Sequence, residues 1–438
     1  MENCKFMKLR GIRLVRNAGS SALLGLAVML FTLAVISCGG IRAQNAPPVP
    51  VIEESDPVGS PNSAADVPAV ASAPEVSAQS GPPEPVIPGM DPPPPHSTQD
   101  VYVLDYSTAD SGAISHVWVI NPSIPRVLTE IQGRTSPDIG ISPDRESVYV
   151  LDSWRSRVHE GDWTHALRKF DAFAGTREWE VDIPGTRVPF TGFPDQTQVI
   201  VSPSGATVFV VMFGGVSRIL TFDAASGAVL AEMPTSRCGA VWLPVSESEV
   251  YSICDKSVTY LDPTTNQRNE LAPLSTDASE LRRVMAATSS SGPRKIWAAT
   301  VIVETGISEL LEMTALTPSD ATIRTLFRLP DGWVFSSSHN ALAASADGSR
   351  IYVGVAPEDA QDFNLAQAVW VYDGNTGKRI GVIPLPEGGF GIDVSADGAL
   401  LYVVNPNSNT FTIIDTESFS TMAKIPGLGV TPIVVRAR

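Results

Sequence analysis

The sequence is poor in the residues from which reactive centres are built. Its 438 residues include four cysteines and five histidines, and none of these form a CxxC, a CxxCH or a zinc-type Cys/His spacing. A nucleophile elbow, an HExxH pair, a P-loop and a paired-glycine dinucleotide loop are missing as well. We therefore assign no catalytic, cofactor-binding or metal-ligating residue from motifs, and a disulfide-rich scaffold is excluded.

Basic residues are also scarce. Lys and Arg number 31 against 47 Asp and Glu, so the formal net charge is −16. No basic block follows the first 16 residues, and a surface of this sign does not attract nucleic acid or anionic lipid. We expect no nucleic-acid partner, and membrane contact only through a lipid anchor. An apolar content of 43% indicates a globular chain of one large domain or two to three smaller ones.

Residues 1–37 have the composition of a lipoprotein-type signal peptide. Five basic residues precede an apolar run of about 15 residues, Ala22 to Ile36, which is short for a permanent membrane anchor, the weaker alternative. Val35-Ile36-Ser37-Cys38 resembles the bacterial lipobox, so Cys38 is expected to be lipidated and to become the mature N-terminus; ordinary cleavage after Ala43 is the alternative. With Gly39 next, the resemblance implies export to the periplasm and anchoring to the outer membrane.

Residues 38–100 form a proline-rich, acidic segment. Of 36 prolines, 15 lie between residues 44 and 100, together with eight acidic residues and no basic one. Such a composition does not support a packed core and favours extended polyproline II geometry. We predict a disordered linker here and a folded domain over 101–438.

Residues 101–438 repeat one unit, in which a short apolar strand, a Ser-containing turn and a Tyr-Val strand follow each other. The clearest turns are Ser142-Pro143-Asp144, Ser202-Pro203-Ser204, Ser345-Ala346-Asp347 and Ser395-Ala396-Asp397. Each unit is followed by a second hairpin, and the seven turns of these hairpins begin near Asn121, Asp171, Asp223, Asp262, Thr317, Asp373 and Asp415. Spacings of about 44 to 60 residues are typical of four-stranded propeller blades.

The prediction is therefore an all-β, seven-bladed β-propeller. Val101–Leu104 lacks a preceding strand and Val430–Val435 lacks a following one, so their pairing would close the ring and remove two sheet edges. A β-sandwich is the alternative. Asp144, Asp347 and Asp397 are interpreted as turn carboxylates rather than catalytic groups. The strand tryptophans are expected to pack between blades: Trp118, Trp297 and Trp370.

Two cysteines flank one hairpin. Cys238 and Cys254 each lie eight residues from Ser246, so they should face each other across adjacent strands. In an oxidising compartment we predict a disulfide between them; two buried thiols are the alternative.

One histidine group invites a functional interpretation. His159, Asp162 and His165 are interpreted either as a metal or acid–base cluster, or as part of a solvated or partner-facing loop spanning Arg155 to Arg168. The arginines in this run, and the lack of apolar pocket residues beyond Trp163, favour the loop.

The repeat unit resembles the YVTN family of seven-bladed propellers. Over Val101 to Val435 the chain also resembles the heavy (large) subunit of methylamine and aromatic amine dehydrogenases. The stretches that carry this second resemblance are Arg155 to Phe170, Arg237-Cys238 with Cys254-Asp255, Asp331-Gly332-Trp333, Val371 to Arg379, Gly391 to Ser395 and Pro426 to Gly429.

The second resemblance implies a periplasmic α₂β₂ quinoprotein that oxidises primary amines to aldehyde and ammonia and passes electrons to a copper protein or c-type cytochrome. In that family the tryptophan tryptophylquinone cofactor and the catalytic base belong to the small subunit. The heavy chain supplies an aromatic residue from the loop after its first strand; here that loop, Tyr106 to Gly112, has no Phe. The alternative function is a membrane-tethered binding or assembly lipoprotein without enzymatic activity.

Overall fold

The computed structural model describes the chain from Ser97 onward, with gaps. Described are residues 97, 99–105, 114–135, 137–155, 161–183, 199–212, 217–235, 238–244, 246–247, 249–254, 257–274, 281–288, 295–302, 307–336, 341–362, 365–428 and 432–436. The expected signal peptide, Cys38 and nearly all of the expected linker lie outside them. Within these ranges no helix has the length and apolar character to span a membrane.

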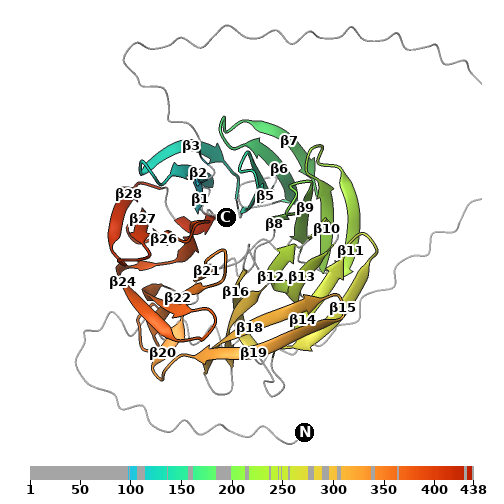
Figure 1. Cartoon of the computed structure of the whole chain (residues 1–438). Helices are drawn as coiled ribbons and strands as arrows, with labels where there is room; N and C mark the ends of the chain where they lie inside the picture. Colours follow the sequence, from blue (N-terminus) through green and yellow to red (C-terminus); the bar gives the residue numbers. More distant parts are fainter. Residues whose placement is uncertain are drawn as a thin grey trace, which may run out of the picture. The chain divides into compact units, whose positions relative to one another are not determined.

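Seven antiparallel sheets follow one another round a ring in chain order (Figure 1). Blade 1 comprises β29 (Pro432–Arg436), β1 (Val101–Asp105), β2 (His116–Asn121) and β3 (Arg126–Gln132). Blade 2 comprises β4 (Asp138–Ile141), β5 (Ser147–Arg155), β6 (Trp163–Asp171) and β7 (Arg177–Asp182). Blade 3 comprises β8 (Val199–Val201), β9 (Thr207–Met212), β10 (Ser217–Asp223) and β11 (Val229–Thr235).

The second half of the ring has the same organisation. Blade 4 comprises β12 (Cys238–Pro244), β13 (Val250–Cys254), β14 (Ser257–Asp262) and β15 (Gln267–Pro273). Blade 5 comprises β16 (Leu281–Thr288), β17 (Ile296–Ile302), β18 (Ser308–Thr317) and β19 (Asp320–Arg328). Blade 6 comprises β20 (Trp333–Phe335), β21 (Leu342–Ala344), β22 (Arg350–Pro357), β23 (Ala366–Asp373) and β24 (Arg379–Gly389). Blade 7 comprises β25 (Gly391–Val394), β26 (Leu400–Asn405), β27 (Thr410–Asp415) and β28 (Thr421–Pro426).

The predicted ring closure is confirmed. β1 pairs antiparallel with β29, with Val103 opposite Val435 and Leu104 opposite Val434. The last strand of the domain thereby becomes the innermost strand of the first blade, and β1 is paired on both sides. All seven second hairpins also turn where predicted, because the strand next to the outermost one in each blade ends at the residue named from the sequence.

The Ser-containing turns are stabilised by hydrogen bonds within each turn. In blade 7 the Ser395 hydroxyl donates to Asp397 Oδ1 at 2.6 Å, and that carboxylate accepts the Ala399 amide at 3.0 Å. The Ser395 Oγ in turn accepts the Leu400 amide at 2.9 Å. The same bonds recur at the turns of Asp144 and Asp347. These aspartates are turn carboxylates, as predicted, and they satisfy backbone donors that strand pairing leaves over.

The core lies between neighbouring blades. The tyrosines of the Tyr-Val strands are buried there. Trp297 and Trp370 belong to one cluster that joins blades 5 and 6, and Trp118 packs against the cluster that joins blades 7 and 1. Trp118, Trp297 and Trp370 therefore pack between blades as expected.

Two local features differ from the simple repeat. Blade 6 has a fifth strand, because β20 and β21 both pair with β22. Gly354 of β22 bonds to Ser336 on one side of this interruption and to Ala341 on the other. A Cβ at Gly354 would lie 3.0 Å from the Cβ atoms of both Ala341 and Ala366, which explains the glycine.

The cysteine hairpin contains a register shift. Cys238 and Cys254 are directly opposed, as expected, but from Trp242 to Pro244 the pairing is centred one residue later than Ser246. A bulge between Cys238 and Trp242 restores the opposition. The side chains of Cys238 and Cys254 lie outside the described part of the structure, so the disulfide stays a prediction.

Candidate functional site

The described part of the segment expected to be a loop, residues 155 and 161–168, is mostly strand. β5 runs to Arg155 and β6 starts at Trp163, and the two strands pair along their whole length. The histidine group does not form one cluster among the described residues: Asp162 is exposed, whereas His165 is 2% exposed, and His159 lies outside the description. Within the described part of the chain, no three His, Cys, Asp or Glu side chains are placed to hold a metal ion.

Among the described residues, the β5–β6 hairpin extends past the other strands of blade 2. The last flanking hydrogen bonds that are described run from the Ser153 amide to the Thr135 carbonyl and from the Ile183 amide to the His165 carbonyl. Two further residue pairs continue beyond them, Trp154 opposite Thr164 and Arg155 opposite Trp163. We call these four residues, 154–155 and 163–164, the blade 2 arm.

Arginines cover both indoles of the arm. The guanidinium carbon of Arg134, from the connection between blades 1 and 2, lies 3.9 Å from the centre of the Trp154 ring. That of Arg155 lies 4.8 Å from the centre of the Trp163 ring, and Trp163 also stacks on His165 at 6.3 Å. Trp154 and Trp163 are half-buried. Cations over indole faces are attracted by the ring quadrupole, so each arginine is held in place by its tryptophan.

A buried ion pair lies beneath the arm. Asp152 is fully buried and pairs with Arg168, and its Oδ1 accepts the Arg134 amide at 2.9 Å. Burial lowers the pKa of Arg168 to about 10, which still leaves it charged at neutral pH. His165 Nδ1 lies 2.8 Å from Ser153 Oγ. The carboxylate and the histidine therefore fix the strands that carry the arm, since a buried charge pair tolerates little displacement.

This base is joined to blade 1. The Gly133 amide donates to the Ser115 carbonyl at 2.7 Å, and the Ser115 amide donates to the Arg134 carbonyl at 3.0 Å. Ser115 immediately precedes β2. The loop 106–112, singled out from the sequence, lies outside the described residues. Polar contacts thus run without interruption from the start of β2 to the base of the blade 2 arm.

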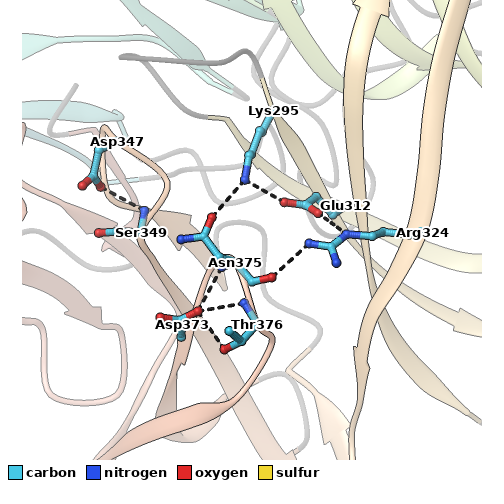
Figure 2. A network of polar contacts seen from close by, with 8 residues as sticks. All are labelled: Lys295, Glu312, Arg324, Asp347, Ser349, Asp373, Asn375 and Thr376. Carbon is cyan, nitrogen blue, oxygen red and sulfur yellow. Dashed lines mark hydrogen bonds and ion pairs between the residues drawn. The ribbon is translucent and has the colours of Figure 1, made fainter.

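A second polar network links blades 5 and 6 (Figure 2). Glu312 of β18 is 1% exposed and pairs with Lys295 at 3.0 Å and with Arg324. Figure 2 shows both cations also reaching Asn375 of blade 6: Lys295 Nζ is 3.4 Å from its Oδ1 and Arg324 Nη2 donates to its carbonyl at 3.1 Å. Every described polar partner here belongs to the blades themselves, so the network joins blades.

A third polar feature is a groove of about 550 Å³ between blades 6 and 7. Its carboxylates include Asp347, Asp397 and Asp415, each of which accepts hydrogen bonds within its own turn. These bonds lower the pKa of each carboxyl group, and for Asp347 the largest contribution comes from the Ser349 amide. The three carboxylates therefore stabilise the turns to which they belong.

Sequence reasoning missed most of the blade 2 site. Asp152 and Arg134 were not singled out, and Arg155, Trp163 and Arg168 were assigned to a loop. The available signal was the continued β alternation through Trp154 and its resumption at Trp163, which indicates a long hairpin. The Arg134–Trp154 contact has no local signal because it joins two blades.

Comparison with known proteins identifies one family. The sequence model of the family described as methylamine dehydrogenase heavy chain matches residues 97–438. Among curated proteins, none matches. A protein from Lactobacillus plantarum is similar in structure, with 15% identity, a TM-score of 0.54 and coverage of 77% of this chain and 98% of that one. The periplasmic gluconolactonase of Pseudomonas aeruginosa is similar at 16% identity and a TM-score of 0.52, with the same coverage of 77% and 98%. These two likenesses show the fold alone.

Proposed function

The chain belongs to the methylamine dehydrogenase heavy chain family, and from this we propose that it is the heavy subunit of a quinoprotein amine dehydrogenase. In this role it holds a small subunit that oxidises primary amines to aldehyde and ammonia. The observation that carries the proposal is the extent of the family match, which covers residues 97–438 and so includes both strands that close the ring.

The geometry favours a scaffold over a catalyst. The groups of the blade 2 site that could act as acid or base are already engaged: Asp152 pairs with Arg168, and His165 lies beside Ser153 in the interior. General acid–base catalysis needs such a group within reach of a substrate. A ring of packed blades instead offers a rigid surface on which a partner can be positioned.

The quinone cofactor, tryptophan tryptophylquinone, would belong to the small subunit, where it supplies the two-electron oxidant for the amine. The described tryptophans of this chain are engaged in packing and stacking contacts within the propeller. Trp333 and Trp370 lie 4.8 Å apart but pack within the cluster of blades 5 and 6, and the two indoles of the blade 2 arm lie under arginines. In this proposal the chain binds and orients the partner, and electrons leave the small subunit for a copper protein or a c-type cytochrome.

The proposed location is the periplasm, with Cys38 lipidated and the domain held on its proline-rich linker at the outer membrane. This part rests on the sequence. A Cys38→Ser variant should move the protein from the membrane fraction to the soluble periplasmic fraction. Retention of that variant in the membrane fraction would argue against the lipid anchor.

The direct test is to purify the full chain from its own host's membranes in mild detergent, and to measure intact subunit masses and the visible spectrum. We expect a stoichiometric small subunit whose quinone absorbance is bleached by a primary amine. A lone, colourless chain would contradict the proposal and leave the tethered binding or assembly lipoprotein as the function. A colourless complex would support a scaffold of another kind.

A further inference from the structure

We infer that the blade 2 arm is the surface through which this chain grips its partner subunit, a protein face that buries the two indoles and presents carboxylates to the arginines over them. This inference rests on the proposed function, because the partner is the small subunit that the proposal requires. It adds the residues of contact and the chemistry of the face that meets them.

The arm holds two tryptophans that lie outside the hydrophobic clusters described between the blades. The chain has eight tryptophans, and the side chains of seven are described. Five of these seven pack in or against the hydrophobic clusters between blades: Trp118, Trp179, Trp297, Trp333 and Trp370. The remaining two, Trp154 and Trp163, join none of these clusters, and both lie on the arm. Exposing indole to water is unfavourable, and Trp and Arg dominate the binding energy of protein interfaces.

The arm is also held rigid before any partner arrives. A two-stranded ribbon is only marginally stable by itself, but here Ser153 and His165 are bonded across its base, and Asp152 holds both Arg168 and the Arg134 amide. Little ordering entropy is therefore lost when a partner binds, which is the main advantage of a preorganised surface.

The charges on the arm and directly beside it indicate the chemistry of the partner. On a chain with a formal charge of −16, Arg134 and Arg155 place two guanidinium groups over the two indoles. A guanidinium stacked on a ring directs its N–H donors sideways, in the plane in which a carboxylate is bound. Asp162, exposed next to Trp163, is the opposing charge. Substitutions of opposite sign at Arg155 and Asp162 should therefore change partner affinity in opposite directions.

The experiment uses the full chain co-expressed with its host's proteins and purified as above. Variants are Trp154→Ser with Trp163→Ser, Arg155→Glu, and Asp162→Asn. Met422→Ser is the matched control, because Met422 is 62% exposed on the outer strand of blade 7. For each variant the co-purified subunit is quantified by intact mass and its dissociation constant by titration, and the thermal midpoint checks folding.

We expect the double tryptophan variant to lose the partner and Arg155→Glu to weaken binding on the order of tenfold or more, whereas Asp162→Asn binds at least as tightly as wild type and Met422→Ser is unchanged. A subunit bound equally by folded wild-type and arm variants overturns the inference but leaves the proposed function standing. A wild-type chain without any second subunit overturns both. Arm variants that change only the chain's self-association would make the arm a contact between copies, which also overturns the inference.

Discussion

Replacing Arg145 by glycine should change the free energy of unfolding, and the sign of this change depends on how the ring is closed. Arg145 has a φ of 70°, a left-handed conformation. In three sister turns the equivalent residue is a glycine, Gly205, Gly348 or Gly398, with φ between 69° and 79°. An L residue costs about 1–2 kcal/mol in this conformation, and glycine loses about 0.5–1 kcal/mol more entropy on folding than other residues. If Arg145 were only a turn residue, Arg145→Gly would stabilise the protein slightly.

The side chain of Arg145 reverses that expectation. It is 5% exposed, its Nη1 donates to the Asp100 carbonyl at 3.2 Å, and its own carbonyl accepts the Tyr102 hydroxyl at 2.8 Å. Burial lowers the pKa of the Arg145 guanidinium, and the nearby Tyr102 and Asp393 partly offset this by raising it. The turn of blade 2 thereby clasps the start of β1, where the ring closes without a covalent turn.

Losing a hydrogen bond to a charged group costs about 1.5–3 kcal/mol, and losing a buried stem of three methylenes costs about 2 kcal/mol. After the local gain is subtracted, we expect Arg145→Gly to lower the free energy of unfolding by about 3 kcal/mol.

The assay is equilibrium urea unfolding of the full chain, combined with hydrogen exchange of peptides from β1 and β14. Exchange should accelerate in β1 and stay unchanged in β14, which lies in blade 4. Asn266→Gly is the control, because Asn266 has a φ of 57° in an exposed turn, and its stability should change by no more than about 0.5 kcal/mol. An Arg145→Gly variant as stable as wild type, or more stable, would refute the reasoning.

Three further predictions follow from single contacts. Glu312→Gln leaves two cations facing a neutral group and should cost about 2–3 kcal/mol in urea unfolding, less than a fully buried pair because Arg324 is 54% exposed; a loss below about 0.5 kcal/mol would show that the network is dispensable. Hydrogen bonds from the Ser395 hydroxyl and the Ala399 amide lower the pKa of Asp397, so its contribution is present above the unfolded-state pKa of about 4 and is lost as pH falls through the folded value. Asp397→Asn should therefore unfold more easily than wild type at pH 7 and differ less from it at pH 3, and equal differences at both pH values would contradict this. Cys238 and Cys254 should resist alkylation until a reductant is added, and mass spectrometry that finds both labelled beforehand would exclude the disulfide.

Short-range signals in the sequence determined the architecture. Strand alternation and Ser-Asp turn chemistry act within a few residues of each other, and their regular recurrence along the chain counts the blades. The seven second-hairpin turns, the opposed Cys238 and Cys254, and the complementary half-blades at the two ends of the domain could therefore all be predicted from the order of the amino acids. Ring closure followed because two unpaired strands had one arrangement that removed both edges.

Contacts between blades were decided only by the tertiary structure. Arg134 meets Trp154, Lys295 meets Asn375 and Arg145 meets Asp100, and in each case the two residues belong to different blades or to the closure of the ring. The physical reason is that β periodicity determines on which face of the sheet a side chain lies. Which residue of the next blade it contacts depends on the twist and stagger of the blades. The same applies to the length of the β5–β6 hairpin. The repeats therefore specify a propeller from the sequence alone, while the surface by which it would bind a partner exists only once the blades are packed.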